Sequence, residues 1–331
     1  MTELTGLLGS QRRALAMAGV ARSTWQYRQS PRSPVPDPVH QADRAYESRI
    51  AAGDRDRIEE LIKLAWARGE SVDFAYATAW DRGVMLASRR TWWRIAAQIE
   101  DQVLRPRAPR RKGKSQRRDA PTVIATAPGQ VWSWDITDVY SPWKGRVYKA
   151  YTIIDIFSRE IVGYRVEDWE SDRLAVEMFA TAIAARGAPR IVHADNGAAM
   201  TSTRLRDLLA GHGVETMYNR PYVSNDNPFS ESAFKTMKYR PGYPRIFETL
   251  QDAREYIDDY VVWYNTEHKH SGIALFSPSE IADGVWEEKW TIRDRALQDY
   301  YEQHPERFRC RPVTPSPADT VGINHRARKI A

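Results

Sequence analysis

The stretch from residue 128 to 267 constrains the fold most, because strand-like and helix-like segments follow one another in it in a distinctive order. Three segments rich in aromatic and β-branched residues come first, and the short turns between them predict an antiparallel meander. Helices and strands then alternate. This order, β-β-β-α-β-α-β-α with one longer helix after it, predicts an α/β fold with a five-stranded mixed sheet flanked by helices. The predicted strands span 131–140, 148–156, 161–166, 190–194 and 214–218, and the predicted helices span 171–186, 204–210, 226–238 and 250–267.

Before residue 100 the sequence is predicted to be helical. A short amphipathic run and a second helix, separated by Gly19, follow the order helix, turn, helix. Farther on, apolar residues recur about every 3.6 positions, and Ser88 is a suitable N-cap for one more helix. We therefore predict a helix-turn-helix motif over residues 1–30 and a helical DNA-binding module over residues 50–104. The predicted helices span 12–18, from Ser23 onward, 55–68 and 89–99.

The start of the last of these helices carries basic and aromatic residues together. Arg89, Arg90 and Arg94 stand beside Trp92 and Trp93. Such a helix start, after another helix, is typical of a recognition helix, so the three arginines are candidate DNA contacts. The alternative is a surface helix whose tryptophans pack inward, and at least one of the two is expected to do so.

A basic linker separates the helical region from the α/β region. Residues 105–118 contain eight arginines and lysines and no acid, and two prolines in it prevent a continuous helix. Like charges at this density repel one another unless a counter-charge lies nearby, and DNA phosphates would supply it. The alternative is a solvated linker. We set the linker at 105–127, the catalytic core at 128–280 and a C-terminal tail of unassigned role at 281–331; the candidate phosphate contacts are Arg110, Arg111, Lys112 and Lys114.

Bulk composition excludes several classes of protein. The one cysteine, Cys310, excludes an internal disulfide scaffold and a Cys-rich zinc site. No apolar stretch is long enough for a transmembrane helix, and the first residues lack the pattern of a signal peptide, so a cytoplasmic protein without a membrane partner is expected. The net charge of +6 is a weak indication of a polyanionic partner.

Three acidic residues lie where this fold can bring them together. Asp135 is in the first predicted strand, Asp195 directly follows the fourth, and Glu231 is on the helix after the fifth. The first and fourth strands can be neighbours in such a sheet, which would place both aspartates at one end of it. Gly197 permits a sharp turn after Asp195. Any of these acids, taken alone, is equally explained as a surface residue.

Three converging carboxylates repel one another and need cations. Hard oxygen ligands select Mg²⁺, with Mn²⁺ as a substitute. Two such ions suit an in-line attack at phosphorus by water or by a DNA 3′-hydroxyl. Asp135 would bridge both ions, and Asp195 and Glu231 would each hold one.

Two lysines and three further acids lie near Asp135, Asp195 and Glu231 in the sequence. Lys238 follows Glu231 by two helical turns and shares its face, so it is either a phosphate contact or a solvent-facing lysine. Lys235, in the same helix, is a further candidate DNA contact. Three other acids are poorer candidates for metal ligands: Asp138 faces away from Asp135, Asp155 is read as structural, and Asp226 is read as the N-cap of the Glu231 helix.

At this point the chain resembles a known family. It is similar to the integrase catalytic core, which has an RNase-H-like fold, and more closely to the second-reading-frame transposases of the IS-three family of bacterial insertion sequences. Two N-terminal stretches, Ala18–Trp25 and Ser88–Ile95, also resemble that family. The matching core stretches are Trp132–Thr137, Ile154–Gly163, His193–Gly197, Asp226–Lys235 and Trp263–Asn265 with His268 and His270 after it.

The resemblance implies a polynucleotidyl transferase that uses two metal ions and Asp135, Asp195 and Glu231. Its members cleave DNA at the ends of the element and join the freed 3′-hydroxyl to a second strand. The implied partners are double-stranded DNA, with terminal inverted repeats and a target, further copies of the chain on that DNA, and a helix-turn-helix protein encoded upstream. The single cysteine excludes the His/Cys zinc head of retroviral integrases.

Two alternatives from other classes fit the same residues. A metal-dependent nuclease on the same fold would use the same triad without joining strands. A non-catalytic DNA-binding regulator, made from an isolated second reading frame, would bind DNA without cutting it. Retention of all three carboxylates speaks against the regulator, and the helical region with the basic linker favours a protein that holds duplex ends.

Overall fold

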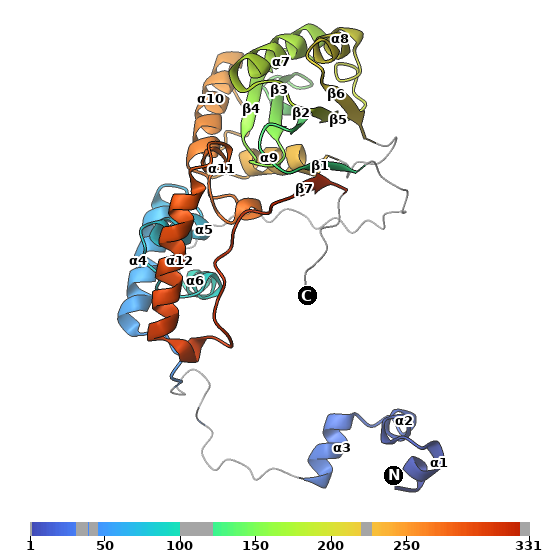
Figure 1. Cartoon of the computed structure of the whole chain (residues 1–331), viewed down its shortest axis with the longest axis vertical. Helices are drawn as coiled ribbons and strands as arrows, with labels where there is room; N and C mark the ends of the chain where they lie inside the picture. The colour runs from blue at the N-terminus through green and yellow to red at the C-terminus, as the bar shows by residue number, and fades with distance from the viewer. Residues whose placement is uncertain (1, 31–38, 40–45, 100–121, 220–226, 325–331) are drawn as a thin grey trace. The chain divides into compact units, whose positions relative to one another are not determined.

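The computed structural model describes residues 2–30, 39, 46–99, 122–219 and 227–324, and its contacts divide the chain into two units, Met1–Arg49 and Ile50–Ala331 (Figure 1). The first unit contains α1 (Thr2–Leu8), α2 (Gln11–Met17) and α3 (Arg22–Gln29). A four-residue turn joins α2 to α3, and Gly19 adopts φ +65° in it, which favours glycine. The order helix, turn, helix agrees with the prediction for this stretch, while α1 was not predicted.

The central sheet has five strands in the order β4-β3-β2-β5-β6. The strands β2, β3 and β4 form the predicted antiparallel meander, and β5 and β6 run parallel to β2. The predicted mixed sheet is therefore confirmed, including the neighbouring positions of β2 and β5. The strands are β2 (Val131–Tyr140), β3 (Val147–Asp155), β4 (Ile161–Glu167), β5 (Ile191–Ala194) and β6 (Glu215–Tyr218).

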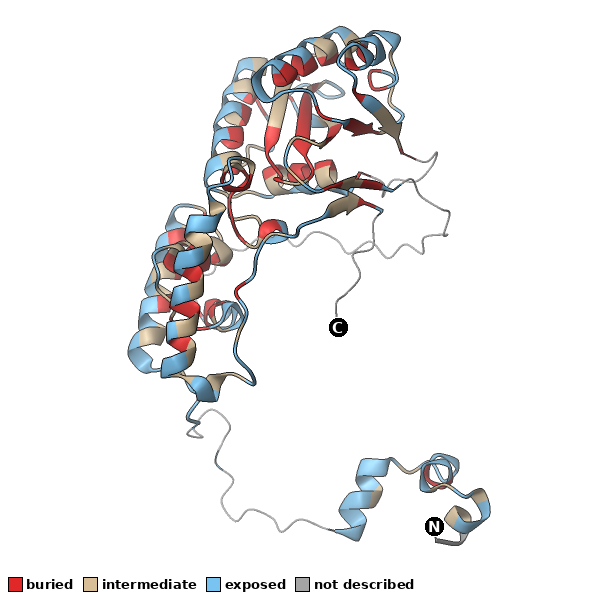
Figure 2. Ribbon diagram, viewed as in Figure 1, coloured by how far each residue is buried: buried red, intermediate tan, exposed pale blue. Residues whose placement is uncertain are grey.

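Helices cover both faces of this sheet, so the buried residues in Figure 2 lie along the strands and beneath the helices. Successive strand residues point to opposite faces. Trp132 and Trp134 therefore pack with α7 (Asp172–Arg186) and α8 (Thr203–Gly211), while Val139 packs with α9 (Pro228–Lys238) and α10 (Leu250–Thr266). By the same alternation Asp135 lies on the α9 side of β2.

The helical module of the second unit contains α4 (Ala52–Ala67), α5 (Val72–Asp81) and α6 (Arg89–Ala96). Trp92 is buried in its core and Trp93 is exposed, which confirms that at least one of the two tryptophans packs inward. The predicted N-cap Ser88 occupies that position, but its hydroxyl pairs with Thr91 Oγ1 and makes no capping bond. None of the helices in the described ranges is long and apolar enough to span a bilayer.

The C-terminal region makes contacts that cross two of the predicted domain boundaries. The segment expected to be a tail contains α12 (Trp286–Gln303), which packs on α5 and contributes to the core of the helical module, and it follows α11 (Pro278–Ala282). Near its end, β7 (Val321–Ile323) pairs with β1 (Val123–Ala125), a strand inside the predicted linker. Residues that pair from such distant parts of the chain leave no local sequence pattern. The boundaries predicted at 127 and 280 therefore separate β1 and α12 from the segments that they contact.

Candidate active site

The register of two parallel strands brings the predicted aspartates together. In the β2–β5 pair, Ser133 lies opposite His193. Extending that register by two residues places Asp135 opposite Asp195, and neighbouring strands lie about 4.8 Å apart. The carboxylate of Asp195 accepts a hydrogen bond from the N–H of Gly197 at 2.8 Å. A Cβ at Gly197 would lie 3.0 Å from that oxygen, so the tight turn after β5 favours a glycine there.

A buried polar network fixes the first turn of α9 to β2 beside Asp135. The Ser133 hydroxyl donates to Asn227 Oδ1 at 2.5 Å, and Asn227 Nδ2 donates to the carbonyl of Trp134 at 3.1 Å. The hydroxyls of Ser133 and Ser230 lie 3.2 Å apart. Side chains with so little exposure must be hydrogen-bonded, and this network joins the helix that carries Glu231 to the strand that carries Asp135. Sequence reasoning did not single out these three residues.

The far end of α9 is bound to the same strand. Lys238 Nζ donates to Thr137 Oγ1 at 2.7 Å and to the carbonyl of Asp138 at 2.9 Å. The lysine is therefore neither fully solvent-facing nor free, and burial lowers its pKa despite the nearby acids. Lys235, one turn after Glu231, pairs with that carboxylate at 3.6 Å and is largely exposed.

The charges of both other predicted acids act on the pKa of Asp135. Burial, together with the negative charges of Asp195 and Glu231, raises the pKa of Asp135 to about 7. The N–H of Ile136, which donates to Asp135 Oδ1 at 2.8 Å, and the charge of Lys238 act in the opposite direction. A buried carboxylate surrounded by like charges has an unmet need for positive charge.

The site fits a divalent cation by chemistry, although its carboxylates are not gathered into a closed cage. Among the described residues, no three His, Cys, Asp or Glu side chains are close enough together to hold an ion as they stand. Asp195 is engaged by Gly197 and Glu231 by Lys235. The available ligands are the carboxylate oxygens of Asp135, Asp195 and Glu231. Mg²⁺ and Mn²⁺ prefer such hard oxygen ligands.

The competing acids have other partners. Asp138 forms an ion pair with Lys149 at 2.7 Å. The Asp155 carboxylate accepts hydrogen bonds from the backbone N–H groups of Gly129, Phe157 and Ser158, which makes it part of the β3–β4 turn. Asp226 lies outside the described residues, and the N-cap position of α9 is held by Asn227.

The two histidines of the last matching motif are packing residues rather than part of the acidic site. His268 stacks on Tyr264 of α10 at a centroid distance of 5.3 Å, and His270 Nδ1 accepts the N–H of Gly272 at 3.0 Å. Burial lowers the pKa of His268 to about 4 and that of His270 to about 3. Both rings are therefore neutral at pH 7.

The predicted DNA-contacting residues divide into three groups. Arg89 makes a bidentate pair with Asp73, at 2.8 and 2.6 Å, so its guanidinium holds α6 to α5. The prediction that Arg89 contacts DNA would require this pair to open. Arg90 and Arg94 are exposed on α6. The linker candidates lie outside the described residues: Arg110, Arg111, Lys112 and Lys114.

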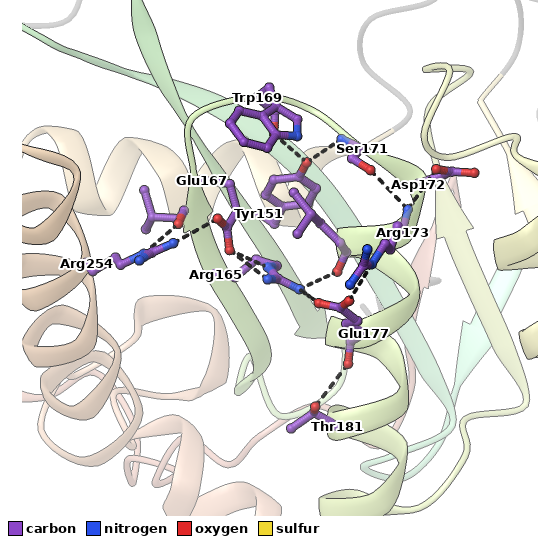
Figure 3. Close-up of polar contacts among 12 residues, drawn as sticks. Tyr151, Arg165, Glu167, Trp169, Ser171, Asp172, Arg173, Glu177, Thr181 and Arg254 are labelled. Carbon is purple, nitrogen blue, oxygen red and sulfur yellow. Dashed lines mark hydrogen bonds and ion pairs between the residues drawn. The ribbon is translucent and has the colours of Figure 1, made fainter.

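A second polar cluster lies on the outer strand β4 and is separate from the acids (Figure 3). Arg165 pairs with Glu167 at 2.7 Å and with Glu177 of α7 at 3.1 Å, and Arg254 of α10 pairs with Glu167 at 2.8 Å. A cavity of about 600 Å³ beside the cluster is lined by β4, α7 and α10. The arginines and glutamates of the cluster neutralise one another. Because these pairs join β4 to α7 and α10, the cluster holds both helices against the edge of the sheet.

Comparison with known proteins finds similarity to integrase core domains and to insertion-sequence transposases. Two models of the integrase core domain match residues 125–224 and 212–278. The transposase for insertion sequence element IS904 of Lactococcus lactis is 37% identical over 180 residues, which are 51% of this chain and 69% of that protein. An uncharacterized 39.2 kDa protein of insertion element IS476 from Xanthomonas euvesicatoria is 26% identical over 279 residues, covering 82% of this chain and 72% of that protein.

Among solved structures, the HTLV-2 integrase catalytic core domain in complex with magnesium aligns with a TM-score of 0.34 and 18% identity, covering 47% of this chain and 97% of that one. The identity and coverage of the IS904 transposase, together with the two domain matches across the strands and helices that carry the acids, show the family. The chain belongs to the insertion-sequence transposases with an integrase core domain.

Proposed function

We propose that this transposase cleaves and joins DNA at the ends of its element, with Asp135, Asp195 and Glu231 as the catalytic acids. One observation carries the proposal: β2 and β5 are paired up to Ser133 and His193, two residues before Asp135 and Asp195, and the charges of Asp195 and Glu231 both act to raise the pKa of the buried Asp135. Three acids from separate parts of the chain lie around the buried Asp135, and the two nearby lysines, Lys235 and Lys238, offset only part of their charge, an arrangement that suits metal-assisted phosphoryl transfer.

The three carboxylates would hold two Mg²⁺ ions, with Mn²⁺ as a substitute. When bound, such ions activate an attacking water or DNA 3′-hydroxyl and stabilise the leaving oxygen. The chain's own contribution is to keep the ligands in place. Asp135 lies in the central strand β2, and Asp195 directly follows the neighbouring strand β5. The Ser133–Asn227–Ser230 network and Lys238 hold α9 along β2 at both ends.

DNA would approach across the α9 side of the sheet. Lys235 is 66% exposed one turn after Glu231, so its ammonium group can contact a phosphate next to the acids. Arg90, Arg94 and the basic linker are proposed to contact the duplex of the element ends, the terminal inverted repeats. Target DNA, further copies of the chain and a helix-turn-helix protein from an upstream frame are the other proposed partners.

A strand-transfer assay tests the proposal. A labelled duplex with the terminal sequence of the element is incubated with the protein and Mg²⁺, and cleaved and joined products are separated. Asp195→Asn and Glu231→Gln are expected to reduce joining by about 1,000-fold or more, because each removes a charged metal ligand, while duplex binding is retained. Asp138→Asn is the matched control and should join normally.

Two outcomes would contradict the proposal. Joining at the wild-type rate by Asp195→Asn would show that the acids are wrongly assigned. Cleavage by the wild-type protein without any joined product would indicate a nuclease on the same fold.

A further inference from the structure

Large apolar side chains are exposed around one end of β2. Tyr140, the last residue of the strand, is 60% exposed, and Trp143 in the following turn is 66% exposed. Tyr239 and Ile246, from the segment between α9 and α10, are 50% and 54% exposed. Single exposed apolar residues are common, but a group of this size in one region indicates a binding surface.

Hydrogen bonds bring the two segments together. Phe247, which follows Ile246, donates its N–H to the carbonyl of Tyr140 at 2.9 Å. Lys238, which precedes Tyr239, donates to the carbonyl two residues before Tyr140, also at 2.9 Å. We call the region formed by segments 140–147 and 238–247 the strand-end surface.

The strand-end surface is basic. Its two segments contain five lysines and arginines and no acid. Arg240 is occupied, since its guanidinium lies 3.8 Å from the ring centre of Trp263, and Arg146 pairs with Asp168 at 2.9 Å. Lys144, which follows Trp143, and Arg245, which precedes Ile246, are exposed. Aromatic rings interleaved with solvent-facing cations are what single-stranded nucleic acid binds, through its bases and its phosphates.

The surface is also rigid and close to the acids. Tyr243 packs edge to face against Phe247 and Tyr256, with ring centres 5.7 and 5.6 Å apart, which anchors segment 238–247. Tyr140 follows Asp135 by five residues of the same strand, so the two positions lie about 17 Å apart along β2 at 3.4 Å per residue, with their side chains on opposite faces of the sheet. Segment 238–247 follows α9 and packs against Val139 on the face of β2 that also carries Asp135, so a DNA strand held by this segment lies on the same side of the sheet as the acids.

We propose that the strand-end surface binds an unpaired stretch of DNA next to the site of cleavage. Stacking requires open base faces, which a duplex hides, so the aromatic residues favour a separated strand. A second copy of the chain is a poorer occupant, because a two-fold interface would set this basic surface against itself. The inference rests on the proposed function, since it takes DNA to be the substrate.

Fluorescence anisotropy tests the proposal with the full chain in EDTA, so that no DNA is cleaved. The probes are a labelled oligodeoxythymidylate and a labelled duplex of the same length. Trp143→Ala is expected to weaken binding of the single strand by about 5- to 150-fold, the loss of one stacked base, and Trp143→Phe should restore most of it. Binding of the duplex should stay unchanged within error.

Trp169→Ala is the matched control, because Trp169 is 65% exposed on a neighbouring loop but stands among Glu167, Asp168 and Glu170. It should bind the single strand like the wild type. Replacing Lys144 and Arg245 by Gln should lower the slope of log affinity against log salt concentration by about 0.7 per residue.

The proposal is overturned if Trp143→Ala binds the single strand as well as the wild type does, or if Trp169→Ala loses as much affinity. It is also overturned if Trp143→Ala alters only self-association, measured by sedimentation without DNA. Failure of the proposed function would give a different result. Asp195→Asn would then still join DNA strands, while the affinities for the single strand measured in EDTA would be as expected.

Discussion

At the scale of single residues, Asp135 carries the clearest electrostatic signature. Burial, with the charges of Asp195 and Glu231, raises its pKa from an ordinary 3.8 to about 7. Since the folded pKa lies above the unfolded one, the folded state binds the proton more tightly. The metal-free protein therefore gains stability from this group at low pH and loses it as pH rises from about 4 to about 7.

Asp135→Asn should remove this pH dependence. In EDTA the variant is expected to gain stability relative to the wild type as pH rises through that window, by up to roughly 1.4 kcal/mol per pH unit. Urea unfolding at a series of pH values measures the difference. A difference that does not change between pH 4 and pH 8 would show that Asp135 is not buried among like charges.

Asn227 is a positioning residue between β2 and α9. Asn227→Ala leaves the Ser133 hydroxyl and the Trp134 carbonyl without their partner, at a cost of about 1–3 kcal/mol, and lets the first turn of α9 shift. We expect a higher Mn²⁺ concentration for half-maximal strand joining. Asn265→Ala is the control, because Asn265 bonds both backbone groups of Ile161 on the sheet edge. An equal change in the Mn²⁺ requirement for both variants would contradict the positioning role.

The candidate site was only partly predictable from residue identity. The acids stand out because strand order limits which carboxylates can meet. The roles of Ser133, Asn227 and Ser230 depend on which polar groups are buried opposite one another, and that depends on the packing of α9 on β2. Lys238 shows the same limit, since its spacing from Glu231 gave its face but not its bond to Thr137.

At the scale of elements, the sequence predicted the strands and helices with alternating or 3.6-residue patterns and missed those without them. Helix α5 is apolar on most sides because other helices surround it, so it has no polar stripe. Helix α12 buries an arginine, Arg293, where a stripe of apolar residues would be expected. The strands β1 and β7 each have three residues and exist only as a pair.

Arg293 joins α12 to the helical module and tests that packing. It is fully buried, pairs with Asp81 at 2.6 Å and donates to the carbonyls of Ala274 and Leu275. Arg293→Lys cannot make all of these bonds, so we expect a loss of about 3–5 kcal/mol in the free energy of unfolding. Arg295→Lys, on the exposed side of α12, should change it by less than about 0.5 kcal/mol. Similar melting of the two variants would contradict the packing.

At the scale of the whole molecule, the two units differ in how they are stabilised. The five hydrophobic clusters among the described residues contain only residues of the second unit. The second unit therefore has its own core, while the first is a group of short helices. The second unit holds the three acids, and we propose that the first serves in DNA recognition.

Deletion of residues 2–45 tests this division. The shortened protein is expected to melt at the same temperature as the full chain, because no clustered core residue is removed. Its affinity for a duplex with the terminal sequence should fall if the helix-turn-helix motif reads that sequence. A large fall in melting temperature on calorimetry would show instead that the second unit depends on the first.

The central claim is that Asp195 binds a divalent metal together with Asp135 and Glu231. Its most direct test is Asp195→Cys, assayed for strand joining with Mg²⁺ and with Mn²⁺. A thiolate is a poor ligand for the hard Mg²⁺ ion and a better one for Mn²⁺. The account predicts no joining with Mg²⁺ and partial recovery with Mn²⁺, while the control Asp138→Cys joins with either ion. Joining by Asp195→Cys at the wild-type rate with Mg²⁺ would contradict it.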